Sequence, residues 1–565
     1  MLSFRSFAAL LAAALLPLSA ADAKTPPVQG KGMVAAANPL AVEAGLNVLR
    51  KGGSAVDAAV AVQAVLGLVE PQSSGIGGGS FMTYYDAKTR KVTAYNGRET
   101  APKAAGPDLF LGADGKPMPF MQAVTSGRAT GVPGAVAMLH LAQGQHGKLA
   151  WKDLFVDAER LADQGFVVSP RLAGMIAGPF PQASQPDAVA YFTKSDGAKY
   201  KAGDLLKNPA YAATLRKIAA EGPKALLEGK IAEDIVRRTT DGPLPGAMTL
   251  DDLKAYQPKA TEAVCRPYRV YIVCVPPAPS GGPAVLEGLG LLANTKFDKT
   301  TATSVEGWYL FSQAQRLMYA DRDRYYGDPD FVDVPMAGLL DAKYLKARAA
   351  LIAPDKAGPA PGPGNPKGAG VRAPDATAEP GGTTHLVIVD ADGNAVSMTT
   401  TVESIFGTGR MVDGFFLNNQ LTDFSFAPKD KDGAPMANAV AGGKRPRSSM
   451  APAIVLDKKK QLVALVGSPG GSNILAYNLK ALVGVIDWKL SMQEAIMLPN
   501  LIARGDNYAS EANGWAPGVL DGLAARGVKI SPVGGEGSGL HGILVTPQGL
   551  TGGADPRREG VARQP

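Results

Sequence analysis

Cysteine and histidine are scarce in this chain, which holds two cysteines and four histidines among 565 residues. Cys265 and Cys274 stand nine positions apart with no histidine nearby, so they lack the ligand spacing of a metal site. The run between them alternates like two strands with a turn near 267–269, and an oxidising compartment would allow a disulfide. Two unlinked strand residues in the wrong register are the equal alternative. We expect no metal and no cofactor.

The sequence also lacks a G-x-S-x-G motif, which argues against a hydrolase built on a serine–histidine–aspartate triad. Of the histidines, His385 has the best position for a catalytic base. It follows Thr383 by two residues on one predicted strand and therefore shares its face. Because the sequence has no serine elbow whose hydroxyl His385 could activate, we interpret His385 as a buried, hydrogen-bonded core residue.

Long apolar runs are missing after the N-terminus, since no later stretch reaches about 18 apolar residues. Residues 1–23 have the form of a signal peptide: Arg5 gives the positive charge, 8–16 the apolar core, and 21–23 an A-x-A cleavage site. An uncleaved anchor is the alternative. We predict an exported protein, periplasmic or secreted, with no stable membrane anchor.

Charge of one sign is not in large excess, because the net charge is only +7 over the whole chain. The basic residues are scattered, apart from Lys458, Lys459 and Lys460, which lie between two apolar runs and are typical of a hairpin turn. This pattern gives no indication of nucleic-acid binding. Apolar residues make up 45% and charged residues 19%, as in globular proteins. Apolar strands alternating with long helices predict a layered α/β fold.

Segment 353–382 is dense in proline, glycine and alanine, and its apolar surface is too small to offset chain entropy. We predict a flexible linker there. It runs directly into a predicted strand at 383–389, a tight turn at 390–394 and a returning strand at 395–402. A flexible segment that leads into a buried hairpin beginning with threonine indicates a cleavage site between Gly382 and Thr383.

Cleavage at this bond would change the chemistry of Thr383. A threonine hydroxyl is a poor nucleophile until a base takes its proton, and the α-amine freed by cleavage can act as that base. The amine has a reference pKa of about 8, so a useful fraction is unprotonated near neutral pH. Two threonines that merely open a strand are the ordinary alternative, and the surrounding motifs argue against it.

These motifs occur in one order at close spacing: TTHLVIVDADGNAVSMTTT (383–401), FGTG (406–409), LNNQLTDFS (417–425), KRPRSSMAPAIV (444–455) and GSPGGS (467–472). Upstream stand YNGRETAP (95–102), PPAPSGG (276–282) and YADRDRYYGDPDF (319–331). Together they closely resemble the gamma-glutamyltranspeptidase family, also called glutathione hydrolases, over nearly everything after residue 30. The resemblance implies an N-terminal nucleophile hydrolase with a four-layer αββα sandwich. It also implies self-cleavage into a large subunit (24–382) and a small catalytic subunit (383–565), which stay intertwined as a heterodimer.

The resemblance gives each expected site residue a role. Thr383 is the nucleophile, Thr401 hydrogen-bonds it, and Gly470 and Gly471 supply the oxyanion donors, as backbone N–H groups at a helix start can. A γ-glutamyl group is a zwitterion, so its site needs acceptors for an ammonium and donors for a carboxylate. The expected ammonium binders are Gln420 and Asp423, and the expected carboxylate binders are Arg98, Ser448 and Ser449. The charged run at 321–331 is expected to be structural.

Glu403 is a departure, because the family commonly has asparagine two residues after the second threonine. Position 420 is glutamine where some relatives have glutamate, so the exchange keeps the number of carboxylates near the ammonium. We expect Glu403 to meet the substrate amine. The segment between Asp423 and Ser448 contains no tyrosine, whereas relatives that cover the bound glutamyl group use an aromatic lid there. This predicts an exposed Thr383 cleft.

The expected function is an exported, self-processing γ-glutamyl hydrolase and transferase. It would cleave glutathione-like donors through a glutamyl–Thr383 ester and pass the acyl group to water, an amino acid or a peptide. One alternative is a related amidase, such as a glutaryl (cephalosporin-type) acylase or a poly-γ-glutamate depolymerase. Another, from a different class, is a non-catalytic exported binding protein.

The linker that abuts Thr383 leads to a first prediction. Intact-mass measurement of the mature protein should find two chains, 24–382 and 383–565, whereas the Thr383→Ala variant should remain whole because it lacks the nucleophile. A cut at any other bond would contradict the assignment of Thr383.

Overall fold

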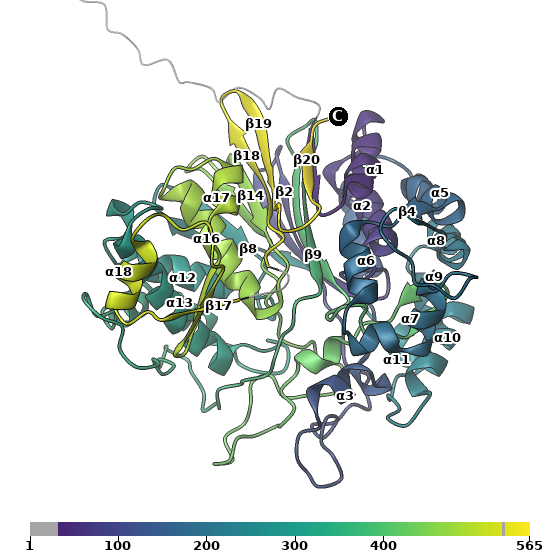
Figure 1. Ribbon diagram of the computed structural model, residues 1–565, viewed down its shortest axis with the longest axis horizontal. Helices are drawn as coiled ribbons and strands as arrows, with labels where there is room; N and C mark the ends of the chain where they lie inside the picture. Colours follow the sequence, from purple (N-terminus) through teal and green to yellow (C-terminus); the bar gives the residue numbers. More distant parts are fainter. Residues whose placement is uncertain (1–31, 534–536) are drawn as a thin grey trace, which may run out of the picture.

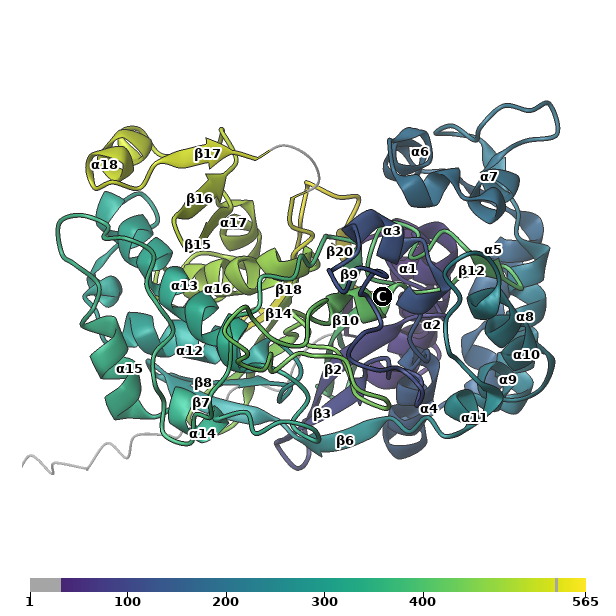
Figure 2. The same ribbon diagram turned by 90° about the horizontal axis from the view of Figure 1, so that it is seen from below.

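The computed structural model describes residues 32–533 and 537–565. Two antiparallel sheets lie face to face at its centre, and helices cover the outer face of each sheet (Figure 1). The turned view separates these four layers (Figure 2). The predicted signal peptide, 1–23, lies outside the described residues. In the described part of the chain, every helix is too short or too polar to cross a membrane.

The first sheet has seven strands. In spatial order they are β20 (Val561–Arg563), β1 (Met33–Ala36), β9 (Thr383–Val389), β10 (Ala395–Thr401), β2 (Gly79–Asp86), β3 (Lys91–Gly97) and β6 (Lys259–Glu262). The hairpin predicted at 383–402 is confirmed as β9 and β10, which lie at the centre of this sheet. Asp390 fixes the turn between them, since its carboxylate accepts the N–H groups of Asp392 and Asn394.

The second sheet has six strands. In spatial order they are β19 (Gly549–Ala554), β18 (His541–Thr546), β14 (Leu462–Gly467), β13 (Ala453–Leu456), β8 (Tyr271–Val275) and β7 (Val264–Tyr268). The predicted lysine turn joins β13 to β14. Cys265 and Cys274 lie directly opposite each other on β7 and β8 and form a disulfide. The bonded alternative for the two cysteines is therefore the correct one.

Five helices contribute most of the layer over the first sheet: α1 (Pro39–Arg50), α2 (Ala55–Val69), α4 (Ala135–His146), α5 (Val156–Gln164) and α8 (Pro209–Glu221). Asn38 caps α1 through the N–H of Leu40, and Ser54 with Asp57 forms a capping box on α2. These are the start signals that the sequence contains. A 3₁₀ turn, Trp151–Leu154, directly precedes α5.

The second sheet is covered by α12 (Gly282–Ala293), α16 (Ile474–Ile486) and α17 (Met492–Met497), and α13 (Val305–Tyr325) packs on α12. Helix α13 extends into the charged run 321–331 as far as Tyr325. That extension is fully helical and largely buried, and it brings Arg322 into the interior.

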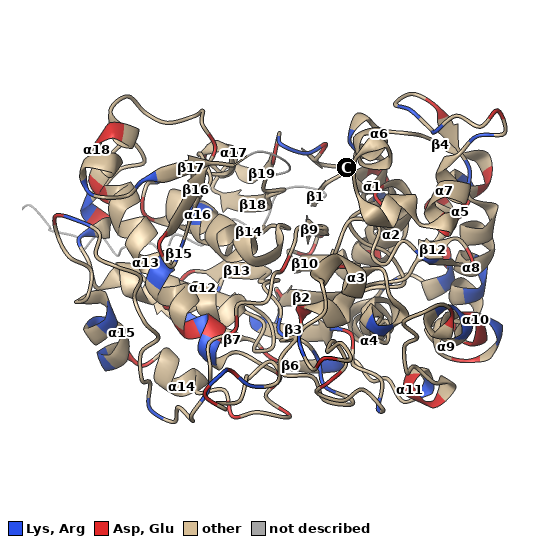
Figure 3. Cartoon of the chain, turned by 60° about the horizontal axis from the view of Figure 1, so that its bottom comes forward, with Lys and Arg blue, Asp and Glu red and all other residues tan. Residues whose placement is uncertain are grey.

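The remaining elements are short and peripheral. They are α3 (Phe120–Val124), α6 (Pro170–Ala177), α7 (Pro186–Phe192), α9 (Lys224–Leu227), α10 (Gly229–Thr240), α11 (Leu250–Lys254), α14 (Met336–Leu339), α15 (Ala342–Ala349), α18 (Val519–Ala525), β4 (Phe166–Val167), β5 (Leu205–Leu206), β11 (Met411–Val412), β12 (Phe415–Phe416), β15 (Leu501–Arg504), β16 (Asn507–Ser510) and β17 (Ile530–Pro532). Basic and acidic residues are interspersed over these elements (Figure 3), in keeping with the small net charge.

The core between the two sheets joins parts of the chain from both sides of the predicted cut. It includes Val387 and Val389 from β9, Ile454 from β13, and Cys274 from β8. Each sheet also hydrogen-bonds strands that precede residue 382 to strands that follow it. Breaking the bond between 382 and 383 would therefore leave both sheets and their shared core continuous.

Segment 353–382 contains no helix or strand, as its composition indicates. Its last third nevertheless makes specific contacts: the N–H of Asp375 donates to the carbonyl of Asp323, and the side chains of Asp375 and Glu379 are buried. The end of the segment thus lies against the catalytic region. Flexibility of the rest of the segment stays a prediction.

Gly78, in the glycine-rich turn before β2, lies against the end of β10. A Cβ atom at this position would stand 1.9 Å from the carbonyl oxygen of Thr401. The absent side chain therefore allows the turn to approach the strand that faces Thr383. Gly144, on α4, has no heavy atom within 4 Å of its would-be Cβ.

A second prediction compares Gly78→Ala with the matched control Gly144→Ala. Overpacking against the backbone costs roughly 1–3 kcal/mol, so Gly78→Ala should lower the melting temperature and slow cleavage at 382–383. Gly144→Ala should be neutral or gain up to about 1 kcal/mol of helix stability. Thermal unfolding and gel analysis of cleavage measure both effects. Wild-type cleavage and stability in Gly78→Ala would show that this close approach is unimportant.

Candidate active site

Thr383 and Thr401 face each other across the β9–β10 pair. Their residues are directly opposite in register, and the Thr383 Oγ1 lies 3.0 Å from the Thr401 Oγ1. Thr401 Oγ1 also accepts the N–H of Glu403 at 2.8 Å. Arg558 donates to the carbonyl oxygen of Thr383 at 2.7 Å. The hydroxyl contact that the resemblance implies is present, and the catalytic roles of the two threonines stay predictions.

His385 is fully buried on the same strand as Thr383. Its Nδ1 lies 2.8 Å from the Thr399 Oγ1, and burial together with His541 lowers the pKa of its imidazole well below the usual value. The interpretation of His385 as a buried, hydrogen-bonded core residue is confirmed.

Arg98 and Asp423 form a buried ion pair. Arg98 follows the end of β3, and Asp423 ends a 3₁₀ turn that begins at Gln420. The Nη2 of Arg98 lies 2.5 Å from the Asp423 Oδ2, to which the Gln420 side chain donates at 2.7 Å. Burial raises the pKa of Asp423 to about 6, although Arg98 acts in the opposite direction. The expected carboxylate binder and the expected ammonium binder are therefore adjacent.

Arg98 has further partners on the chain segment before the two serines. Its Nη2 donates to the carbonyl oxygen of Arg447 at 2.7 Å, and its Nε donates to that of Pro446 at 3.2 Å. Only 1% of the Arg98 residue is exposed. Its orientation is thus fixed by the backbone as well as by Asp423.

Glu403 lines a small cavity together with Thr383 and Asp423. Its backbone conformation is unusual, with φ = 80°. Its carboxylate accepts a hydrogen bond from the Ser404 hydroxyl at 2.5 Å and another from the Asn419 side chain. Burial raises the pKa of Glu403 well above its usual value, and the nearby Asp423 raises it further. Two carboxyl groups thus share a buried site near Thr383, where desolvation and mutual repulsion favour retention of a proton.

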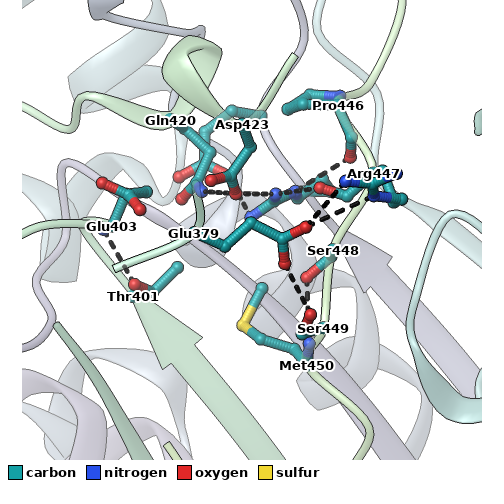
Figure 4. A network of polar contacts seen from close by, with 12 residues as sticks. Glu379, Thr401, Glu403, Gln420, Asp423, Pro446, Arg447, Ser448, Ser449 and Met450 are labelled. Carbon is teal, nitrogen blue, oxygen red and sulfur yellow. Dashed lines mark hydrogen bonds and ion pairs between the residues drawn. The ribbon is translucent and has the colours of Figure 1, made fainter. Parts of the chain in front are cut away.

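Ser449 does not face an open pocket, because its hydroxyl donates to the Oε2 of Glu379 at 2.5 Å (Figure 4). Arg322 donates to the same carboxylate at 2.8 Å and to Ser449 Oγ at 2.7 Å. Arg447 donates to the other oxygen of Glu379 at 3.0 Å. The hydroxyl of Ser448 accepts the N–H of Met450 at 3.1 Å.

The electrostatics of Glu379 follow from these two arginines. Burial alone would raise its pKa, but Arg322 and Arg447 outweigh that effect and hold the pKa of the carboxyl well below its usual range. Glu379 is therefore ionised at all ordinary pH values and completes a buried cluster of alternating charges.

Glu379, Arg322 and Arg447 are the residues that sequence reasoning missed. Helical periodicity was the available signal for Arg322, since it follows the buried Met318 and Tyr319 by four and three positions. Arg447 directly precedes the two serines, and Glu379 is the one glutamate in 353–382. The expectation that 321–331 is purely structural is therefore too narrow: Arg322 contacts Ser449, a predicted substrate-binding residue.

Gly470 and Gly471 form the loop before α16. Both have positive φ values, 136° and 56°, and a 3₁₀ turn precedes the helix, which begins at Ile474 rather than the expected Asn473. A Cβ at Gly471 would lie 2.0 Å from the carbonyl oxygen of Glu379. The N–H of Ser472 donates to that carbonyl at 3.1 Å. The predicted oxyanion loop thus contacts the segment immediately before the cut.

The space left among these residues is a cavity of about 20 Å³, roughly enough for one water. Its lining includes all the predicted side chains of the site: Arg98, Thr383, Thr401, Glu403, Gln420, Asp423, Ser448 and Ser449. Glu379 and Pro380 line it too, and only 4% of Thr383 is exposed. The predicted exposed cleft is wrong for the uncleaved chain, because segment 379–382 fills it. The turn at 429–433 is polar and largely exposed, as expected.

Residues 41–564 match the family model described as gamma-glutamyltranspeptidase. The chain belongs to the gamma-glutamyltranspeptidase family. It is 37% identical to the glutathione hydrolase proenzyme of Bacillus subtilis (strain 168), over 98% of this chain and 96% of that protein. It is also 37% identical to the glutathione hydrolase proenzyme of Escherichia coli (strain K12), over 94% and 91% of the two chains.

Among solved structures, this gamma-glutamyltranspeptidase family member is similar to the cephalosporin acylase of Bacillus halodurans. The TM-score is 0.82 at 25% sequence identity, and the match covers 100% of this chain and 99% of the acylase. Together with the two packed sheets and their helix layers, this confirms the αββα sandwich expected from the resemblance.

The raised pKa of Asp423 gives a third prediction, which the uncleaved Thr383→Ala protein can test. A carboxyl with a raised folded-state pKa stabilises the fold below its unfolded pKa and loses that contribution as pH rises through about 6. Asp423→Asn removes the titration, so its stability relative to the parent should increase between pH 4 and pH 7. The increase should be at most about 3 kcal/mol, at about 1.4 kcal/mol per pKa unit.

Chemical denaturation of both proteins across that pH range measures the difference. Asp392→Asn is a matched control at an exposed turn position, and it should show no comparable trend. A difference between Asp423→Asn and its parent that stays flat with pH would contradict the raised pKa.

Proposed function

We propose that this gamma-glutamyltranspeptidase family member is exported, cuts itself between Gly382 and Thr383, and then cleaves γ-glutamyl amides through an ester on Thr383. The observation that carries the proposal is the position of Thr383. It is the first residue of a central strand, its hydroxyl contacts Thr401, and it shares one cavity with all six of the predicted substrate-binding residues.

The residues suggest a two-step reaction. Once the preceding bond is broken, the free α-amine of Thr383 takes the hydroxyl proton and Oγ1 attacks the γ-carbonyl carbon of the donor. Backbone N–H groups at Gly470 and Gly471 stabilise the oxyanion, and the leaving amine departs with the proton. Water or the amine of an amino acid or peptide then attacks the resulting ester, which releases glutamate or a new γ-glutamyl amide and restores Thr383.

Binding of the donor requires recognition of a zwitterion. Asp423, Gln420 and Glu403 offer acceptors for the α-ammonium on one side of the cavity. Arg98, Ser448 and Ser449 offer donors for the α-carboxylate, and the planar guanidinium suits a carboxylate well. Glutathione-like molecules have both groups on their γ-glutamyl end, so we infer that they are the donors.

A glutaryl acylase is the second candidate, favoured by the structural similarity to cephalosporin acylase. A glutaryl group has no ammonium. The cavity nevertheless contains two carboxyl groups, Glu403 and Asp423. Asp423 is paired with Arg98, whereas Glu403 has hydrogen bonds from Ser404 and Asn419 but no ion pair among the described residues, and a buried carboxylate without a cationic partner is costly. This charge arrangement favours the γ-glutamyl donor. A non-catalytic binding protein would hydrolyse neither a γ-glutamyl anilide nor a glutaryl anilide, and the wild type and Thr383→Ala would be equally inactive.

A fourth prediction separates the two catalytic candidates. Glu403→Gln should lower kcat/KM for a γ-glutamyl anilide more than for a glutaryl anilide, because only the first presents a cation to Glu403. A hydrogen bond to a charged group contributes roughly 1.5–3 kcal/mol, which corresponds to about 10- to 150-fold in kcat/KM. Steady-state rates with both anilides provide the measurement. The exposed Glu43→Gln serves as a control that should leave both rates unchanged.

Equal losses for the two anilides would make Glu403 a structural residue. Faster wild-type turnover of the glutaryl anilide than of the γ-glutamyl anilide would instead favour the acylase.

A further inference from the structure

The Glu379 carboxylate is the shared partner of two fully buried arginines. Arg322 and Arg447 each have 0% of the side chain exposed, and both lie within 3.0 Å of the Glu379 carboxylate. Each arginine has one other acidic neighbour at 3.2 Å, Asp323 for Arg322 and Asp375 for Arg447. Ser449 donates a further hydrogen bond to Glu379. This is a complete carboxylate-binding site, built from a guanidinium on α13, a guanidinium before β13 and a serine hydroxyl.

The carboxylate in this site comes from segment 353–382, which the predicted cleavage would separate from β9. Glu379 precedes Thr383 by four residues, and both residues line the same cavity. In the uncleaved chain the peptide bond at 382–383 ties this segment to β9. After cleavage the segment becomes a chain end. Hydrogen bonds such as those from Arg316 to Gly358 and from Arg348 to Gly362 hold its first part, but no helix or strand anchors its last residues.

We infer that Glu379 stands in for the α-carboxylate of the donor, and that Arg322 and Arg447 bind that carboxylate together with Ser449 once the cut segment withdraws. This inference rests on the proposed γ-glutamyl function. It adds two arginines to the binding residues expected beside Arg98, and it makes self-cleavage the step that vacates the site.

Charge balance supports the exchange. Removal of one partner from a buried, hydrogen-bonded ion cluster is strongly unfavourable, because it leaves a charge without compensation. Withdrawal of Glu379 would leave Arg322 and Arg447 with one acidic neighbour each and an excess of positive charge at Ser449. A donor α-carboxylate restores the original balance, whereas a neutral group in its place does not.

The carboxylate-binding site lies next to the residues that are expected to bind the α-ammonium of the donor. Arg98 and Asp423 lie beside Arg447, whose carbonyl oxygen accepts a hydrogen bond from Arg98. Asp423, Ser449 and Glu379 line one cavity. Arg322 and Arg447 adjoin it through their contacts with Glu379. Figure 4 shows Asp423, Glu379 and Arg447 close together, as the two charged groups on one α-carbon require.

The first experiment compares two donors that differ only in the α-carboxylate: L-γ-glutamyl p-nitroanilide and 4-aminobutanoyl p-nitroanilide. In the processed enzyme, Arg447→Met should lower kcat/KM for the γ-glutamyl anilide by roughly 10- to 100-fold more than for the 4-aminobutanoyl anilide. Arg447→Lys, which keeps a cation, should recover part of the selectivity. Arg316→Met is the control. Arg316 lies on the same helix as Arg322, but its hydrogen bonds go to Gln313, Gly358, Gly505 and Asp506 and not to Glu379 or Ser449.

Equal losses for both anilides in Arg447→Met would overturn the assignment of the arginines, although γ-glutamyl turnover by the wild type would leave the proposed function intact. No turnover of γ-glutamyl anilide by the wild type would instead refute the proposed function itself. The two failures are therefore distinguishable.

A second experiment uses the uncleaved Thr383→Ala protein, so it does not depend on the arginine variants folding. Acetate, which has the size of the carboxylate end of a glutamate side chain, should not raise the melting temperature of this protein, because Glu379 occupies the carboxylate site. Adding Glu379→Ala should create a saturable increase with acetate and none with the neutral acetamide. Glu306→Ala, at a partly exposed ion pair with Arg526, is the matched control and should create none. No acetate-dependent shift in the Glu379→Ala protein would refute the stand-in role.

Discussion

The register between β9 and β10 is the constraint on which the site depends. Side chains alternate between the two faces of a strand, so a slip of one residue would move the Thr383 hydroxyl away from Thr401 and to the opposite face. Asp390 fixes the register at the turn, and β1 and β2 hold the two strands from either side. Because the hairpin lies at the centre of the sheet, the position of Thr383 is set by paired strands rather than by a loop.

This central position requires that the polar groups of the site be buried before any donor arrives. Arg98 pairs with Asp423, and Arg322 and Arg447 pair with Glu379. Buried charges are tolerated when they are matched and hydrogen-bonded. The uncleaved chain meets this requirement with a residue from the segment that self-cleavage would release. If Glu379 has the role inferred above, self-cleavage would exchange one anion for another in this site, and maturation would be linked to the binding of a charged ligand.

Local signals explain what the sequence predicted correctly. The strands around Asp390, the caps at Asn38 and Ser54, and the predicted site residues that line one cavity all follow from patterns within a few residues or from family motifs. The Glu379 cluster was not predictable in this way, because its partners are 57 and 68 residues distant and no local pattern marks an ion pair. For the same reason the composition of the linker predicted flexibility throughout 353–382, whereas three hydrogen-bonding side chains hold Glu379 in the site.

The strained backbone of Glu403 is a second reason, beside the chemistry of its carboxyl group, to expect a role for this residue in the site. A φ of 80° lies in a region that asparagine tolerates better than glutamate, and asparagine is what the family commonly has at this position. A residue in so unfavourable a conformation costs about 1–3 kcal/mol and persists where its surroundings determine it. Here the Ser404 hydroxyl and the Asn419 amide fix the carboxylate beside Asp423. The longer side chain is thus held toward the cavity at a strained position, where it places a titratable carboxyl group that an asparagine amide could not supply. The charge of this group depends on its surroundings, because burial and Asp423 raise its pKa well above the usual value.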